Sequence, residues 1–233
     1  MTNLIGGGGL GDAAMIFAAL NSNESPVDIK SEDYLLTHVE VPSTLIQAIR
    51  DFYCYQGIRS NVLNIRSYDN WMTENRQGYD HFVAACWHGL VGREKGWRIN
   101  SFPDITYDHV DDVDILISPS AGRSNDRRFT DNEFIEFTNN DSVSIITHFI
   151  PDGKVGEWIQ ARMKIGKALL ATNVRDVVDR ICSSSVVVGN SGFVTFLAGM
   201  AGKKVFQLPE KPASDYRTDP NWNVTEIYSL EEI

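Results

Sequence analysis

Two glycine turns, each between an apolar run and a helix-like stretch, restrict the fold of this chain most strongly. The first lies in "NLIGGGGLGDAAMIFAAL" (3–20) and the second in "SSSVVVGNSGFVTFLAGMAGKKVF" (183–206). In both, a short apolar strand runs into small residues and then into an apolar helix. Strand–turn–helix units of this kind build parallel sheets. The sequence therefore predicts an α/β fold.

The same alternation recurs along the chain and predicts two Rossmann-like parallel-sheet halves that face a cleft. An aspartate-rich segment, 103–114, resembles a linker, so we place the halves at 1–110 and 111–233. The tail 209–233, rich in Pro, Asp and Asn, is expected to be irregular. We expect strands over 2–5, 82–87, 115–118, 144–150, 186–188 and 204–208, and helices over 12–20, 43–55, 131–138, 155–164 and 191–201, with a further helix from its cap at Asn173 to Cys182.

Composition narrows the class of protein. The 233 residues contain no apolar run of membrane-spanning length, and the N-terminus lacks the basic start of a signal peptide. A net charge of −10 argues against broad, nonspecific nucleic-acid binding. Cys54, Cys86 and Cys182 match no zinc spacing, and the last two adjoin apolar runs typical of buried thiols. We expect a cytoplasmic protein without a metal site.

The first turn admits two interpretations. Gly6, Gly8 and Gly11 satisfy the G-x-G-x-x-G pattern, which favours an NAD(P)-dependent oxidoreductase or a flavin enzyme. However, Asp12 follows directly, where a pyrophosphate would approach the helix. The alternative is a bare turn of Gly8, Gly9, Leu10 and Gly11 that lets Asp12 approach a substrate. Asp12 could also simply stabilise the helix N-terminus.

The second turn favours an anion site. Asn190, Ser191 and Gly192 stand between a three-valine strand and a helix, where backbone N–H groups and the Ser191 hydroxyl suit a diphosphate. The alternative is that Asn190 and Ser191 only cap the helix. A loop in "ISPSAGRSNDRRF" (117–129) adds Arg123 and Arg127, which either bind phosphate or are solvated.

At these three segments the chain resembles the GT-B glycosyltransferases, in particular the heptosyltransferase family (glycosyltransferase family 9). That family has a strand, a glycine turn and Gly-Asp at a helix start, as in "GGGGLGDAAMIFAAL". Its second domain opens with a strand and a basic-basic-aromatic run, similar to "SPSAGRSNDRRF". Near the end it has a strand, Asp-Ser-Gly and a helix before another strand, similar to "VVVGNSGFVTFLAGMAGKKVF", where Asn190 replaces the aspartate.

The resemblance implies a glycosyltransferase that transfers a hexosyl, heptosyl or pentosyl group from a nucleotide diphosphate-sugar. The donor would bind the half 111–233 and the acceptor would face the half 1–110. Asp12 would act as the base in a direct displacement that needs neither metal nor cofactor. The donor diphosphate would lie against Arg123, Arg127, Asn190, Ser191 and Gly192.

The acceptor and a non-enzymatic alternative stay open. The acceptor hydroxyl belongs either to a saccharide or to a hydroxylated base in DNA, which some bacteriophage enzymes modify in the host cytoplasm. "GREKGWR" (92–98) and the lysines and arginine of 154–167 could contact DNA phosphates, although charged runs are commonly solvated loops. Trp71, Trp87 or Trp97 could stack on an extruded base. The alternative function is a non-catalytic nucleotide-sugar binding protein. The sequence does not indicate an oligomeric state.

Overall fold

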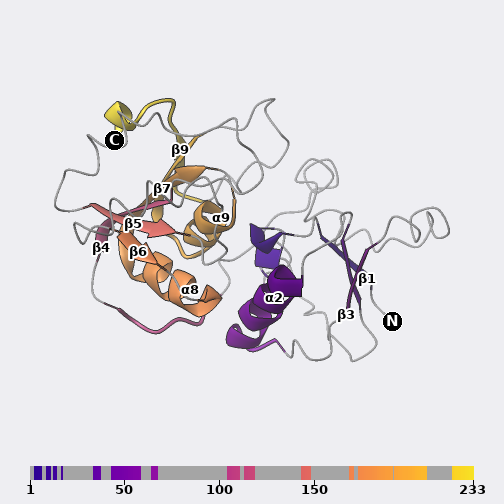
Figure 1. Cartoon of the computed structure of the whole chain (residues 1–233). Helices are drawn as coiled ribbons and strands as arrows, with labels where there is room; N and C mark the ends of the chain where they lie inside the picture. Colours follow the sequence, from indigo (N-terminus) through magenta and orange to yellow (C-terminus); the bar gives the residue numbers. More distant parts are fainter. Residues whose placement is uncertain are drawn as a thin grey trace. The chain divides into compact units, whose positions relative to one another are not determined.

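The chain forms two compact units, one of Met1–Thr106 with Asp215–Asp219 and one of Tyr107–Ser214 with Pro220–Ile233. They are called unit 1 and unit 2 below (Figure 1). The computed structural model describes residues 3–6, 9–11, 13–14, 17, 34–37, 43–58, 64–67, 104–110, 113–118, 143–147, 168–170, 173–190, 192–208 and 222–233.

Unit 1 contains a parallel sheet in the order β1 (Asn3–Gly6), β2 (Tyr34–Thr37), β3 (Asn64–Ser67). In its register Gly6 is opposite Thr37, and Thr37 is opposite Ser67, so these strands end at one edge. The strand predicted at 2–5 is confirmed with a shift of one residue. β2 and β3 were not predicted, because four residues are too short to show an alternating pattern.

Two helical segments pack together in unit 1. The helix after the first glycine turn begins where the Ala13 N–H donates to the Gly9 carbonyl at 3.1 Å. The helix α2 (Ser43–Tyr55) has the predicted bounds. The rings of Phe17 and Phe52 meet edge to face, with centroids 5.7 Å apart, and the Tyr53 hydroxyl donates to the Ala13 carbonyl at 3.2 Å. These contacts hold the helix that follows the glycine turn against α2.

Unit 2 is built on a larger parallel sheet, as predicted. Its described strands pair in the order β6-β5-β4-β7-β8-β9, which is the 3-2-1-4-5-6 order of a doubly wound Rossmann sheet. The bounds are β4 Val113–Ser118, β5 Val143–Thr147, β6 Ala168–Leu170, β7 Ser184–Asn190, β8 Lys204–Leu208 and β9 Val224–Glu226.

Two helices contact each other and the strand β7 (Figure 1). The helix α8 (Val174–Ser183) starts as predicted, because the Asn173 side chain accepts a hydrogen bond from the Asp176 N–H at 3.1 Å. The helix α9 (Phe193–Met200) is buried along its whole length and starts after Gly192, two residues later than predicted. It ends with a Schellman motif in which the Lys203 N–H donates to the Ala198 carbonyl at 2.9 Å.

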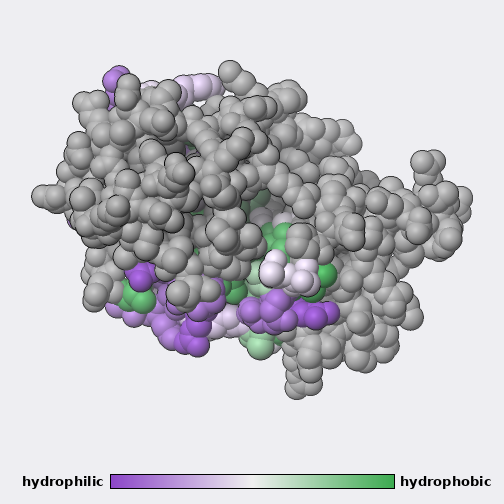
Figure 2. Space-filling view, viewed as in Figure 1, coloured by the Kyte–Doolittle hydropathy of each residue, from purple (hydrophilic) through white to green (hydrophobic). Residues whose placement is uncertain are grey.

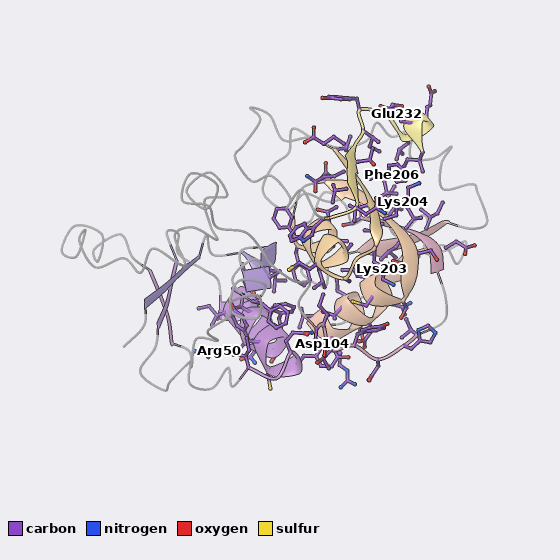
Figure 3. The ribbon with its side chains drawn as sticks, turned by 180° about the vertical axis from the view of Figure 1, so that it is seen from behind. Arg50, Asp104, Lys203, Lys204, Phe206 and Glu232 are labelled. Atoms are coloured by element: carbon purple, nitrogen blue, oxygen red, sulfur yellow. The ribbon has the colours of Figure 1, made fainter. Side chains whose placement is uncertain are left out.

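The tail is more ordered than predicted, so that expectation is wrong in part. β9 pairs with β8, and a short 3-10 helix, η2 (Leu230–Glu232), follows it. The Glu232 carboxylate accepts hydrogen bonds from the N–H groups of Tyr228 and Ser229. Figure 3 labels Glu232 in this short helix. Trp222 lies so close to α9 that a Cβ on Gly199 would come within 2.7 Å of its ring. Because Trp222 and Gly199 are far apart in the chain, the local sequence does not predict this contact.

Some expectations concern residues outside the described ranges, namely the strand at 82–87 and the helices at 131–138 and 155–164. The thiol of Cys182 is buried as predicted, and burial raises its pKa to about 12. Cys54 is exposed, and Cys86 is not described. No helix in the described part of the chain is long and apolar enough to cross a membrane.

Gly202 should be the most sensitive position in the turn after α9. Its φ of +71° is unfavourable for residues with a Cβ. We expect Gly202→Ala to lower the free energy of unfolding by about 1–2 kcal/mol. Gly202→Asn is the matched control and should lose less, because asparagine tolerates this conformation. Urea denaturation followed by circular dichroism measures both, and equal losses would contradict a conformational cause.

Candidate nucleotide-binding site

The carboxyl edge of the unit 2 sheet has one point where the strand order reverses. β4 and β7 are neighbours there, with Ser118 opposite Gly189. From β4 the chain builds outward through β5 and β6, and from β7 it builds the other way through β8 and β9. In doubly wound sheets a reversal of this kind is where the connections leave toward opposite faces and a crevice opens at the strand ends.

Gly189 lets β7 approach its neighbours closely at this edge. A Cβ at this position would lie 3.0 Å from the Ser118 carbonyl oxygen and 3.4 Å from the Cγ2 of Thr195. The first of these distances is shorter than an ordinary van der Waals contact. Glycine at 189 thus keeps the turn after β7 close to the end of β4.

The Thr195 hydroxyl holds the turn between β7 and α9. Its Oγ1 accepts from the Gly192 N–H at 3.1 Å and lies 3.0 Å from the Asn190 carbonyl, to which it can donate. Gly192 is the N-cap residue of α9 and has no side-chain cap. Thr195 was missed in the sequence, although a threonine three residues after the cap is a recognisable signal.

This arrangement changes the predicted environment of Gly192 and Asn190. The Gly192 N–H, expected to face a diphosphate, donates to Thr195 in this structure. Asn190 is buried at the end of β7, and Ser191 lies outside the described residues. Of the N–H groups at this helix start that were expected to face an anion, the Gly192 N–H is therefore already paired within the turn.

Buried polar side chains continue along the same edge. Ser118, Asn190 and Gln207 stand at or near the ends of three neighbouring strands, and each is at most 5% exposed. The Gln207 Oε1 atom is buried with no hydrogen-bond partner in the described part of the chain. Buried amides are normally paired. The end of the sheet is thus polar, in contrast to the apolar strand centres.

The structure describes only part of the first glycine turn. Gly9 and Gly11 are partly exposed, and Leu10 is buried at 6% exposure, so its side chain is a core residue. Asp12 and Gly8 are outside the described residues, as are Arg123 and Arg127. Within the described ranges, no group of three or more His, Cys, Asp or Glu side chains is arranged to hold a metal ion.

Comparison with known proteins identifies the fold. No protein-family model matches the chain, and no curated protein matches it. Among solved structures, ADP-heptose LPS heptosyltransferase II from E. coli aligns with a TM-score of 0.54 and 14% identity, over 97% of this chain and 90% of that one.

Two further structures agree. A glycosyl transferase family 9 protein from Veillonella parvula DSM 2008 gives a TM-score of 0.54 and 9% identity, over 97% of this chain and 85% of its own. The E. coli heptosyltransferase WaaC with ADP-2-deoxy-2-fluoro heptose gives 0.50 and 11%, over 97% and 93%. The predicted resemblance to heptosyltransferases is therefore confirmed at the level of the α/β, GT-B fold.

Thr195→Val should loosen the turn without changing the shape of the side chain. The Gly192 N–H loses its acceptor, so we expect about 1–3 kcal/mol lower stability and faster exchange of the Gly192 amide. Thr195→Ser keeps the hydroxyl and should preserve the slow exchange. Amide exchange by NMR distinguishes the two, and equal exchange in both variants would exclude the hydroxyl as the holding group.

Proposed function

We propose that this chain is a glycosyltransferase that uses a nucleotide diphosphate-sugar donor bound at the carboxyl edge of the unit 2 sheet. The strand order carries the proposal. Because β4 and β7 are parallel neighbours, the segments that follow these two strands begin side by side at the same edge of the sheet. The segment after Ser118 contains Arg123 and Arg127, and the turn after Asn190 contains Ser191. Ligands of doubly wound sheets bind at this kind of reversal.

The donor diphosphate would be stabilised by charge and by the end of α9. Arg123 and Arg127 can each form two parallel hydrogen bonds to phosphate oxygens. The first-turn amides of α9 add the partial positive charge of a helix N-terminus. These groups would stabilise the leaving nucleoside diphosphate, which gains negative charge as the sugar bond breaks. The Thr195 hydroxyl would act indirectly, by holding the turn.

Asp12 would be the base in unit 1. In the sequence it lies between Gly11 and Ala13, which both belong to the helix that follows the glycine turn. Its carboxylate takes the proton of the acceptor hydroxyl, whose oxygen forms the new bond to the anomeric carbon. The bond to the leaving phosphate breaks with its electron pair. No metal or cofactor enters this step.

The acceptor would be a saccharide hydroxyl or a hydroxylated base in DNA. The heptosyltransferase neighbours favour a saccharide. A DNA base would require local phosphate contacts from 92–98 and 154–167 against a net charge of −10. We place the reaction in the cytoplasm, the host cytoplasm in the case of a phage enzyme, where a buried reduced thiol such as Cys182 is typical.

Two assays test the two units separately. Nucleotide binding tests the proposed donor site of unit 2, and sugar transfer tests the proposed base of unit 1. ADP is the first nucleotide to test, because WaaC was solved with an ADP-sugar analogue, followed by UDP, GDP and CMP. We expect one of these to raise the melting temperature of both the wild type and Asp12→Asn. Transfer from the matching nucleotide-sugar should fall at least about 100-fold in the variant, since it lacks the base.

The outcomes also decide between the alternatives. Wild-type turnover by Asp12→Asn would exclude Asp12 as the base. Nucleotide binding without transfer or slow donor hydrolysis would indicate a non-catalytic binding protein. A fluorescence response to NAD(P)H with none to nucleoside diphosphates would favour an oxidoreductase that uses Gly6, Gly8 and Gly11.

Salt dependence distinguishes the acceptors. If the acceptor is DNA, we expect the apparent affinity for hydroxylated DNA to fall steeply with salt, because each neutralised phosphate releases counterions. With a saccharide acceptor, transfer should change little between low and physiological salt. Initial rates measured at a fixed nucleotide-sugar concentration over that range decide the question.

A further inference from the structure

The chain passes between the two units at three points, between Thr106 and Tyr107, between Ser214 and Asp215, and between Asp219 and Pro220. The segment 104–110 contains the first of these divisions. It forms neither helix nor strand, and its exposed surface is largely hydrophilic (Figure 2). The sequence predicted a solvated linker here. Backbone groups on both sides of this division nevertheless form hydrogen bonds. Those before it bond a side chain of unit 1, and those after it bond side chains of unit 2.

On the unit 1 side, Gln56 binds the linker with both ends of its amide. Nε2 donates to the Thr106 carbonyl at 2.9 Å, and Oε1 accepts from the Thr106 N–H at 2.8 Å. Gln56 is itself fixed, because it ends α2 in a Schellman motif at Gly57, whose φ is +81°. Only 9% of Gln56 is exposed. Thr106 is thus joined to unit 1 by a pair of hydrogen bonds.

On the unit 2 side, two buried side chains of α8 bind the linker. Asp179 Oδ1 accepts from the Asp108 N–H at 2.8 Å, and Ser183 Oγ accepts from the Val110 N–H at 3.1 Å. The two side chains are four residues apart and so lie on one face of the helix. Arg175, one turn earlier, pairs with the Asp108 carboxylate. The linker from Asp108 onward is therefore part of unit 2.

We propose that Tyr107 is the hinge of this connection. Within the segment 104–110, it lies between the part bound by Gln56 and the part bound by α8, and it is exposed, at 43% for the residue. Its N–H donates no hydrogen bond within the described ranges. Reorientation of the units at this connection would then use the torsions around Tyr107, while the bonds on either side stay intact.

This hinge would matter for the proposed transfer, because the donor and the base belong to different units. A linker that unfolded during each cycle would lose the hydrogen bonds to Gln56, Asp179 and Ser183. Rotation about a few bonds at one residue avoids that loss. The hinge itself does not depend on the proposed function, and both tests below run without donor or acceptor.

Amide exchange tests whether the two sides are independent. Gln56→Ala should speed exchange of the Thr106 amide about tenfold and leave Asp108 and Val110 unchanged. Ser183→Ala should speed exchange of Val110 and leave Thr106 unchanged. Gln47→Ala, an exposed glutamine of α2 that bonds Asp51, is the control and should change none of these amides. If one substitution speeds exchange at Thr106, Asp108 and Val110 alike, the segment is a single rigid strap and the hinge is excluded.

Inter-unit distances give a second, direct test. One spin label is attached to the native, exposed Cys54 of unit 1 and a second to unit 2 in the variant Glu231→Cys, so the distance between the labels is a distance between the units. Cys86 is replaced by serine. Cys182 stays unlabelled because burial raises its pKa to about 12. We expect Tyr107→Pro, which fixes φ at about −65°, to narrow the distance distribution, and Tyr107→Gly to broaden it. Folding is checked by circular dichroism, and unchanged distributions in two folded variants would overturn the proposal.

Discussion

The pairing of β4 with β7 is the interaction on which the rest of unit 2 depends. These strands are separated in sequence by the whole of β5, β6 and α8, yet they are neighbours in the sheet. Their pairing reverses the direction in which the sheet is built, and this brings the ends at Ser118 and Gly189 together. Gly189 allows the close approach, because any larger residue would meet the Ser118 carbonyl.

The polar groups at this edge follow from the same pairing. The Thr195 hydroxyl reaches back to the turn because α9 packs directly on β7 and β8. Its bond to the Gly192 N–H gives this amide a partner within the protein.

The linker shows how side chains can replace regular secondary structure. Gln56, Asp179 and Ser183 bond backbone groups of 106, 108 and 110 as a neighbouring strand would. In the sequence these are a polar residue at a helix end and two polar residues on a helix face. Each would be assigned to solvent, since its partner lies at least 50 residues away in the chain.

The sequence by itself determined the α/β class, the bounds of α2, the Asn173 cap and the strand β8, because each depends on local pattern and capping. The assignment of Arg123, Arg127 and Ser191 to the donor phosphates and of Asp12 to the base stays a prediction. Only the tertiary structure decided the strand order and the short strands β2, β3, β6 and β9. The physical reason is that these features arise from hydrogen bonds and packing between distant segments, which leave no periodic or local signal in the chain.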